Sequence, residues 1–317
     1  MDVFTHFVFG TLMYVLFLKE VTFEYIYLAM FFAILPDLDI FITPLKRIFK
    51  SNYLEHRGGS HSYIIGIIIS IIVGIIYSLL TQQTVYIACI IGIIFYGLHV
   101  SMDLLTTTKI PCLYPLSKKE YSFYVEKAGS LFTMVNSVIF LISLGLLYNI
   151  SADIFLINLL INFYTSFFII YYLYRIISKI WLSSNLKKNQ KYLPGILPFY
   201  YIVYKYDIVE NEISLSIERK SHFSKTKGIK NIITVLNSEE MAFFEKVIEL
   251  CNSHYYYAKW TIFPIFIRNE EIFSIKFFFL ETLIRKRTMY IQFDFDKFTQ
   301  ELIGFNRGSG SIFLSSF

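Results

Sequence analysis

The sequence predicts a polytopic α-helical membrane domain of about six transmembrane helices, followed by a small soluble α+β domain. Three observations lead to this fold class. The chain is 55% hydrophobic and only 17% charged, with a mean hydropathy of +0.53, whereas soluble domains carry about 25% charged residues. No Asp, Glu, Lys or Arg occurs between Ser62 and Met102. Beyond about residue 190, in contrast, charges return every few residues.

Six apolar segments approach or exceed the roughly 20 helical residues that cross about 30 Å of hydrocarbon. The first segment is short and begins with polar residues, so partial insertion is the alternative for it. The N-terminus lacks the basic start of a signal peptide, and we therefore expect this helix to remain in the mature protein. The segments are residues 3–18, 23–42, 62–80, 85–105, 130–149 and 153–174.

The distribution of Lys and Arg predicts the orientation of these segments. Basic residues accumulate in cytoplasmic loops, and here they gather within 46–57, 109–127 and 175–191. The intervening connections are short and nearly free of positive charge, with Lys19 as the exception. This pattern predicts a multi-pass protein of the cell (inner or plasma) membrane with both termini in the cytoplasm. The net charge of +5 is therefore expected to attract anionic membrane lipid as a partner, and we do not expect nucleic acid to bind.

Residues 1–185 form the predicted transmembrane metal-site domain, and residues 186–317 form the predicted cytoplasmic α+β domain. In the latter, the runs 200–206, 212–219, 260–267, 272–281 and 288–295 alternate as strands do. Ser238 is the expected N-cap of a helix that ends near Asn252. Cys89, Cys112 and Cys251 are far apart and are expected to be free thiols. His222 and His254 have no partner spacing and are expected to be structural, and the partner of this domain is left open.

Histidines and aspartates lie at the ends of the first four segments. His99 and Asp103 are spaced i, i+4, which places them on one helix face. The predicted topology brings the start of the first segment, the end of the second, the start of the third and the end of the fourth to the cytoplasmic face. We expect seven metal ligands to converge there, with Asp2 and Glu55 as weaker candidates: His6, Asp37, Asp39, His56, His61, His99 and Asp103.

Imidazole nitrogens and carboxylate oxygens bind zinc, manganese and iron. The set predicts one to three divalent ions, zinc first and manganese or iron as alternatives, that lower the pKa of bound water. Asp37, Asp39 and Asp103 are the predicted catalytic carboxylates, one of them as general base, and Arg57 would hold a phosphate oxygen. Helix capping by the first two aspartates is the plainer alternative. His99 and Asp103 favour function, because ionisable groups in an otherwise uncharged span are costly.

These motifs resemble the YdjM-like family of inner-membrane metal-dependent hydrolases over about residues 1–120. Ser60 stands where the family usually has Thr, which keeps the hydroxyl. The resemblance implies a hydrolase, and a looser similarity to zinc-dependent phospholipase C enzymes implies a phosphoester substrate such as a lipid headgroup. The matching residues are Met1-Asp2, Thr5-His6 and Gly10, Leu35-Pro36-Asp37-Leu38-Asp39, His56-Arg57-Gly58, Ser60-His61-Ser62, His99, Asp103 and Thr106, and Tyr114-Pro115.

The expected function is a membrane-bound metal-dependent hydrolase that acts on an amphiphilic, phosphoester or phospholipid-like substrate at the cytoplasmic face. A transporter or metal-ion permease with the same ligands is the first alternative. Transporters tend to place their sites near the bilayer midplane, whereas these polar groups lie at segment ends. A metal-stabilised membrane sensor or scaffold, with the C-terminal domain as the working part, is the second alternative.

Overall fold

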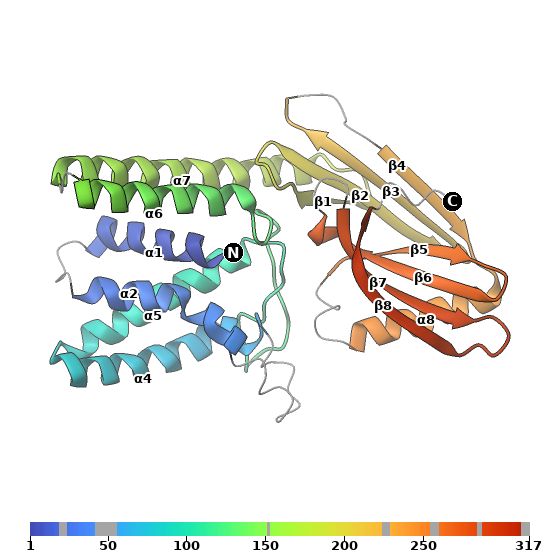
Figure 1. Cartoon of the computed structure of the whole chain (residues 1–317), viewed down its shortest axis with the longest axis horizontal. Helices are drawn as coiled ribbons and strands as arrows, with labels where there is room; N and C mark the ends of the chain where they lie inside the picture. Colours follow the sequence, from blue (N-terminus) through green and yellow to red (C-terminus); the bar gives the residue numbers. More distant parts are fainter. Residues whose placement is uncertain are drawn as a thin grey trace. The chain divides into compact units, whose positions relative to one another are not determined.

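The N-terminal part of the chain is helical, and the C-terminal part is built mainly from strands (Figure 1). The computed structural model describes residues 1–18, 24–41, 56–150, 153–223, 229–253, 260–283 and 287–311. It divides into two units, Met1–Ile180 and Trp181–Phe317.

The helices of the first unit are arranged around α5, which packs against α4, α2 and α1, while α1 also packs against α6. Of two short 3-10 helices, η1 lies next to α5 and η4 next to α4, and the two also contact each other. The elements are α1 (Val3–Leu18), α2 (Tyr25–Ile34), η1 (Leu35–Phe41), η4 (Gly59–His61), α4 (Tyr63–Thr81), α5 (Val85–Leu104), α6 (Leu131–Ile150) and α7 (Ile154–Ser184).

Four of the described helices, α4 to α7, are long and apolar enough to cross a membrane. This is fewer than the six spans predicted. Helix α1 has 16 residues and α2 has 10, both short of the roughly 20 that a span requires. The predicted second segment ends early because the α-helix gives way to η1 at Leu35, directly before Pro36, a residue without a backbone donor. The polar end of that segment thus becomes a separate element.

Helices α4 and α5 approach closely because α4 presents small side chains to α5. A Cβ atom added to Gly66 would lie 2.4 Å from the Tyr96 ring, and one added to Gly74 would lie 2.9 Å from the backbone nitrogen of Cys89. Small residues at every fourth position are typical of closely packed membrane helices. This packing fixes the helix that carries His99 and Asp103. The buried residues of α4 are Gly66, Ser70, Gly74 and Ser78.

The second unit contains two four-stranded antiparallel sheets, each with its strands in sequence order. The runs 200–206 and 212–219 are strands as predicted, and they form a hairpin at Glu210-Asn211, where Val209 pairs with Glu212. The first sheet comprises β1 (Gln190–Pro194), β2 (Tyr200–Val209), β3 (Glu212–Ser221) and β4 (Ile229–Val235). Helix α8 (Ser238–Ser253) follows, and then β5 (Ile262–Arg268), β6 (Ile272–Phe279), β7 (Arg287–Asp296) and β8 (Leu302–Ser311).

The core of this unit is aromatic. Phe243 and Phe244 of α8 pack with Phe273 and Phe277 of β6 in one buried cluster. The start of α8 corrects the predicted N-cap: Asn237, not Ser238, accepts the hydrogen bond of the Glu240 backbone N–H at 2.8 Å. The Glu240 carboxylate in return accepts the Asn237 backbone N–H at 3.1 Å, the reciprocal arrangement of a capping box.

Candidate metal centre

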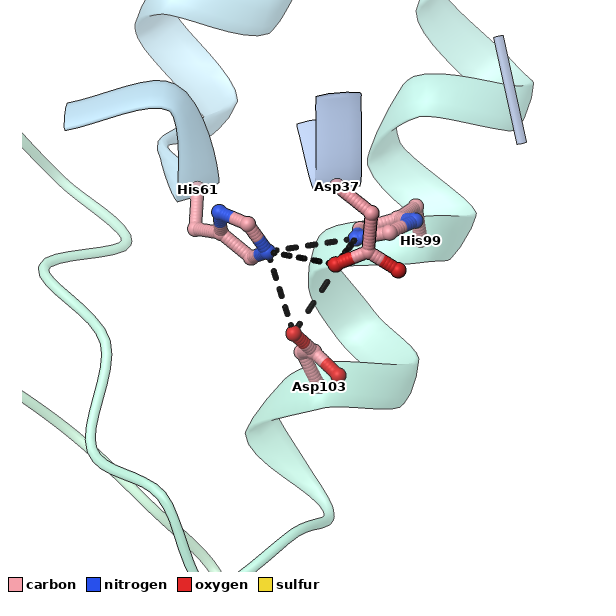
Figure 2. A group of neighbouring side chains, drawn as sticks. All are labelled: Asp37, His61, His99 and Asp103. Carbon is pink, nitrogen blue, oxygen red and sulfur yellow. Dashed lines mark hydrogen bonds and ion pairs between the residues drawn. The ribbon is translucent and has the colours of Figure 1, made fainter. Parts of the chain in front are cut away.

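Four buried side chains point toward one another at one end of α5 (Figure 2). Asp37 comes from η1, His61 from η4, and His99 and Asp103 from the last turns of α5. Each offers a ligand atom, and these four atoms all lie within 4.8 Å of one another. His61 Nε2 lies 3.1 Å from Asp103 Oδ2 and 3.5 Å from Asp37 Oδ1. Segments separated in sequence therefore build one compact donor set.

The two imidazoles are held in a common orientation by contacts outside the donor set. His99 Nδ1 lies 2.7 Å from the carbonyl oxygen of Ala33, which can only accept, so Nδ1 carries the proton. His61 Nδ1 lies 3.4 Å from Asp39 Oδ2 and 3.1 Å from Ser60 Oγ. Both rings thus turn Nε2 toward the donor set, and the two Nε2 atoms are 3.3 Å apart. Such outer contacts are typical of metal-binding histidines.

The donor set has the electronic character of a cation site. Asp37 Oδ1 and Oδ2 and Asp103 Oδ2 are buried and accept no hydrogen bond from the described residues. A neutral imidazole protonated on Nδ1 presents a lone pair at Nε2. Lone pairs and carboxylates therefore face one another away from water, an arrangement that is costly without a compensating positive charge. Asp37, His61, His99 and Asp103 fit a divalent metal ion in both residue type and number.

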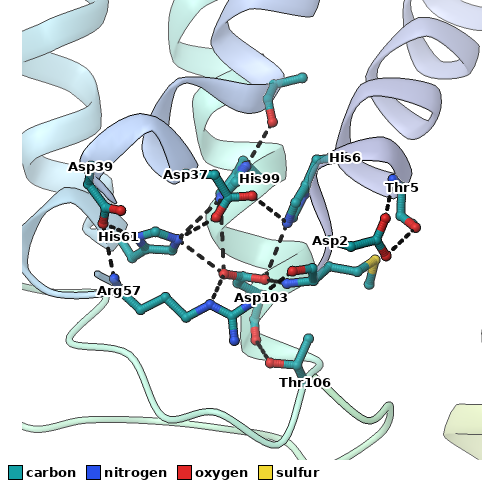
Figure 3. A network of polar contacts seen from close by, with 12 residues as sticks. Asp2, Thr5, His6, Asp37, Asp39, Arg57, His61, His99, Asp103 and Thr106 are labelled. Atoms are coloured by element: carbon teal, nitrogen blue, oxygen red, sulfur yellow. Dashed lines mark hydrogen bonds and ion pairs between the residues drawn. The ribbon is translucent and has the colours of Figure 1, made fainter. Parts of the chain in front are cut away.

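His6 lies at the edge of this donor set (Figure 3). Its Nε2 is 3.3 Å from Asp103 Oδ1 and 3.9 Å from Asp37 Oδ2, and its ring stacks on His99 with centroids 3.7 Å apart. The amino group of Met1 contacts Asp103 Oδ1 as well. His6 thus lies beside the group of four and outside it.

Asp2, in contrast, is occupied by the start of α1. Its carboxylate accepts the backbone N–H of Thr5 at 2.9 Å and the Thr5 hydroxyl at 2.6 Å. This is the geometry of a helix cap. The other weak candidate, Glu55, lies outside the described residues, as does His254.

Asp39 and His56 do not join the group of four. Asp39 accepts hydrogen bonds from the Arg57 backbone N–H at 3.0 Å and from Ser60 Oγ at 2.5 Å. His56 Nδ1 lies 2.6 Å from Asp39 Oδ1, and the His56 side chain is 43% exposed. The oxygens of Asp39 are therefore committed to the loop that carries His61. Asp39 thus lies on the side of His61 that faces away from the donor set, and His56 contacts Asp39 on the exposed side.

Arg57 reaches into the centre from a left-handed backbone conformation. Its φ is 61°, which is unfavourable for a residue with a Cβ. The side chain extends along Asp103, with Nε 3.3 Å from Asp103 Oδ2, and Nη2 donates to the Met1 carbonyl at 2.8 Å. The hydrogen bond from the Arg57 backbone N–H to Asp39 stabilises this strained conformation. A guanidinium is thereby fixed beside a carboxylate of the donor set.

A family model described as the YdjM inner membrane protein matches residues 1–182, more than half of the chain. The chain belongs to this family. The YdjM match contains every residue of the donor set, and it extends past the roughly 120 residues that carry the motifs to include α6 and nearly all of α7. It supports a membrane protein, together with the four apolar helices. No curated protein and no solved structure matches the chain.

Proposed function

We propose that this YdjM-family protein is a membrane-bound metal-dependent hydrolase for a phosphoester or phospholipid-like substrate. One observation carries the proposal: two imidazole Nε2 atoms and the carboxylates of Asp37 and Asp103 face one another, buried, within 4.8 Å. His61, His99 and the two aspartates would hold one divalent ion, with zinc favoured over manganese or iron by the mixed His/Asp set. His6 would provide a further ligand.

The chemistry divides among the residues around the ion. When bound, a divalent ion supplies a water of lowered pKa and acts as a Lewis acid toward the substrate oxygen. An oxygen of Asp37, whose carboxylate accepts no hydrogen bond from the described residues, would serve as general base for water. The Arg57 guanidinium beside Asp103 binds a phosphate oxygen of the substrate. Asp39 orients His61 and does not itself meet the substrate.

The position of the centre favours an amphiphilic substrate. The donor set lies where α5 ends and next to the start of α4, two helices long enough to span the membrane. A centre at the ends of spans lies near the headgroups of the lipid. We place it on the cytoplasmic side, with both termini there, because Lys and Arg gather in the loops at this end. The second unit is accessory in this proposal.

The direct test is metal analysis of the purified full-length protein, combined with hydrolysis assays on mixed phospholipid vesicles. His61→Ala and His99→Ala are compared with His222→Ala, a histidine of the second unit beside the Tyr201 ring. Wild type and the His222 variant should contain about one metal ion per chain and release phosphate or headgroup. Both centre variants should lose metal and activity. Unchanged metal content in both centre variants would contradict the proposal.

Two outcomes of the same experiment would support the alternatives. Accumulation of metal ions by proteoliposomes, without hydrolysis of any phosphoester in the panel, would indicate a permease. Retained metal without either activity would indicate a structural metal in a sensor or scaffold. Deletion of the second unit then separates these roles, because an intact hydrolysis rate would show that unit to be accessory.

A further inference from the structure

A buried ion pair joins α7 to the segment between α5 and α6. Arg175 of α7 and Glu126 have side chains that are 2% and 0% exposed. The contact is two-pronged: Arg175 Nη2 donates to Glu126 Oε1 at 3.2 Å, and Nε lies 3.1 Å from Oε2. The hydroxyl of Tyr171, one turn earlier on α7, also donates to Glu126. Neither member of the pair belongs to the metal centre.

The backbone around Glu126 is bound to the residues that directly follow Asp103. The backbone N–H groups of Val125 and Glu126 both donate to the Leu105 carbonyl at 2.9 Å, and that of Phe123 donates to the Leu104 carbonyl at 2.7 Å. Thr106 pairs with Glu126 in a parallel bridge. The segment 123–126 therefore lies along 104–106 as a short strap.

The strap is connected to Asp103 itself. The backbone N–H of Thr106 donates to the Asp103 carbonyl at 3.0 Å, and the Thr106 hydroxyl donates to the same oxygen at 2.8 Å. Asp103 Oδ2 in turn lies 3.1 Å from His61 Nε2 in the donor set. A continuous series of contacts thus runs from Arg175 through Glu126 and the strap to the backbone of Asp103, whose side chain belongs to the centre.

We propose that Glu126 and Arg175 are positioning residues for the metal centre, and we call this pair the latch. Burial of both charges carries a large desolvation cost, and ionisable groups in a membrane domain are expensive. Two parallel contacts between a guanidinium and a carboxylate fix direction as well as distance. The latch holds the strap against the end of α5, and the hydrogen bonds of the strap fix the backbone from which the Asp103 side chain extends toward His61. Helix α7 thereby acts on a centre to which it contributes no ligand.

This inference rests on the metal centre of the proposed function, and its test needs no hydrolysis. The variant E126M/R175M removes both charges together, which avoids an unpaired buried charge and favours folding. The matched control is E218M/K220M, which removes an ion pair of 2.7 Å in the second unit. Both proteins are purified at full length and titrated with Co²⁺, and the visible absorption of the bound ion reports its ligand geometry.

We expect the latch variant to bind Co²⁺ about 10- to 100-fold more weakly, the usual effect of losing an outer support of a metal site. Its spectrum should change, because the Asp103 oxygen shifts. The control should keep wild-type affinity and spectrum. Wild-type Co²⁺ affinity and spectrum in E126M/R175M would show that the positioning role is wrong.

Hydrogen exchange of the backbone amides separates positioning from unfolding. In E126M/R175M, the amides of Phe123, Val125 and residue 126, which donate the hydrogen bonds of the strap, should exchange faster while those of α4 keep their wild-type protection. Fast exchange throughout α4 and α5 would mean general unfolding and would overturn the proposal. A wild-type protein that binds no Co²⁺ would refute the metal centre, and unchanged exchange at 123–126 in the variant would then refute the latch separately.

Discussion

His99 donates a hydrogen bond from Nδ1 to the carbonyl oxygen of Ala33 at 2.7 Å, and this contact between α5 and α2 turns Nε2 toward His61. Asp39 and Ser60 lie on the corresponding side of His61. The direction of both imidazoles is thus set by groups that would not touch the ion. The contacts around these histidines and elsewhere in the two units lead to five testable predictions.

Asp39→Asn should weaken zinc binding about 10- to 100-fold, the range expected when an outer partner of a ligating histidine is changed. The amide removes the negative charge that faces His61 Nδ1 and can no longer accept at both oxygens. Competition with a chromophoric chelator measures the affinity. Asp207→Asn, which alters a carboxylate paired with Lys205 in the second unit, should keep wild-type affinity. Equal zinc affinity in the two variants would contradict the role given to Asp39.

Arg57→Gly should be more stable than Arg57→Ala by about 1 kcal/mol, because glycine adopts a positive φ without the steric cost of a Cβ. Both variants lose the guanidinium, so both should raise KM for a phosphoester substrate more than they lower kcat if Arg57 binds the substrate anion. Thermal unfolding in one detergent compares the two stabilities. Identical midpoints would show that φ at residue 57 is not a source of strain.

Gly74→Ala should destabilise the first unit by about 1–3 kcal/mol, the usual cost of overpacking. The new Cβ would meet the Cys89 backbone nitrogen at 2.9 Å, and backbone does not yield easily. Gly145→Ala on α6 is the control, since a Cβ there meets nothing within 4 Å and alanine favours the helix. The thermal unfolding midpoint should therefore fall in Gly74→Ala and rise in Gly145→Ala.

Removal of metal should lower the unfolding midpoint of wild type, because an ion that binds only the folded chain stabilises it by mass action. The chelator should have no effect on His61→Ala or His99→Ala, whose centre is already disrupted. Scanning calorimetry with and without chelator gives the comparison. A wild-type midpoint that does not change with chelator would show that the donor set holds no ion under those conditions.

The ion pair between Glu240 and Arg268 should give the second unit a pH-dependent stability. The hydrogen bond from Arg268 lowers the pKa of Glu240 below its ordinary value of 4.5. The charged form is therefore favoured in the folded state. Its stabilisation is present above the ordinary pKa and disappears as pH falls through the lowered one. Glu240→Gln keeps the capping box but loses the charge.

Wild type should accordingly unfold at a higher temperature than Glu240→Gln at pH 7, and the two midpoints should converge as the solution is acidified below about pH 4. Thermal unfolding followed by the tryptophan signal of Trp260 and Trp181 measures both proteins. A difference between the midpoints that is independent of pH would mean that the Gln variant is destabilised through packing and not through loss of the ion pair.

Much of the centre could be predicted from sequence because its chemistry is local. The spacing of His99 and Asp103 specifies a shared helix face. The pattern of Lys and Arg predicted that the polar ends of the first four segments lie on the same side of the membrane. The hydrogen bond from His99 to the Ala33 carbonyl could not be predicted, since every residue has a backbone carbonyl and the residue type does not show which one is used. The Glu126–Arg175 contact joins residues 49 apart in sequence, and only tertiary packing reveals it.

The predicted number of membrane spans was wrong where a helix ends within an apolar segment. Hydropathy alone carries the second segment through Pro36, but the α-helix ends before it and η1 begins at Leu35. In the second unit, β1, β4 and β8 lack a clear alternation of apolar and polar residues, so the sequence does not single them out. Asn237 was missed as the N-cap because Ser238 has an equal intrinsic preference for that position.

The burial of all four centre side chains has a kinetic consequence. Ligand exchange at a metal ion normally begins with attack by water or by a competing donor, and an ion held by these buried side chains could be approached only at the positions that they leave open. An ion bound there would therefore exchange more slowly than one held by exposed side chains.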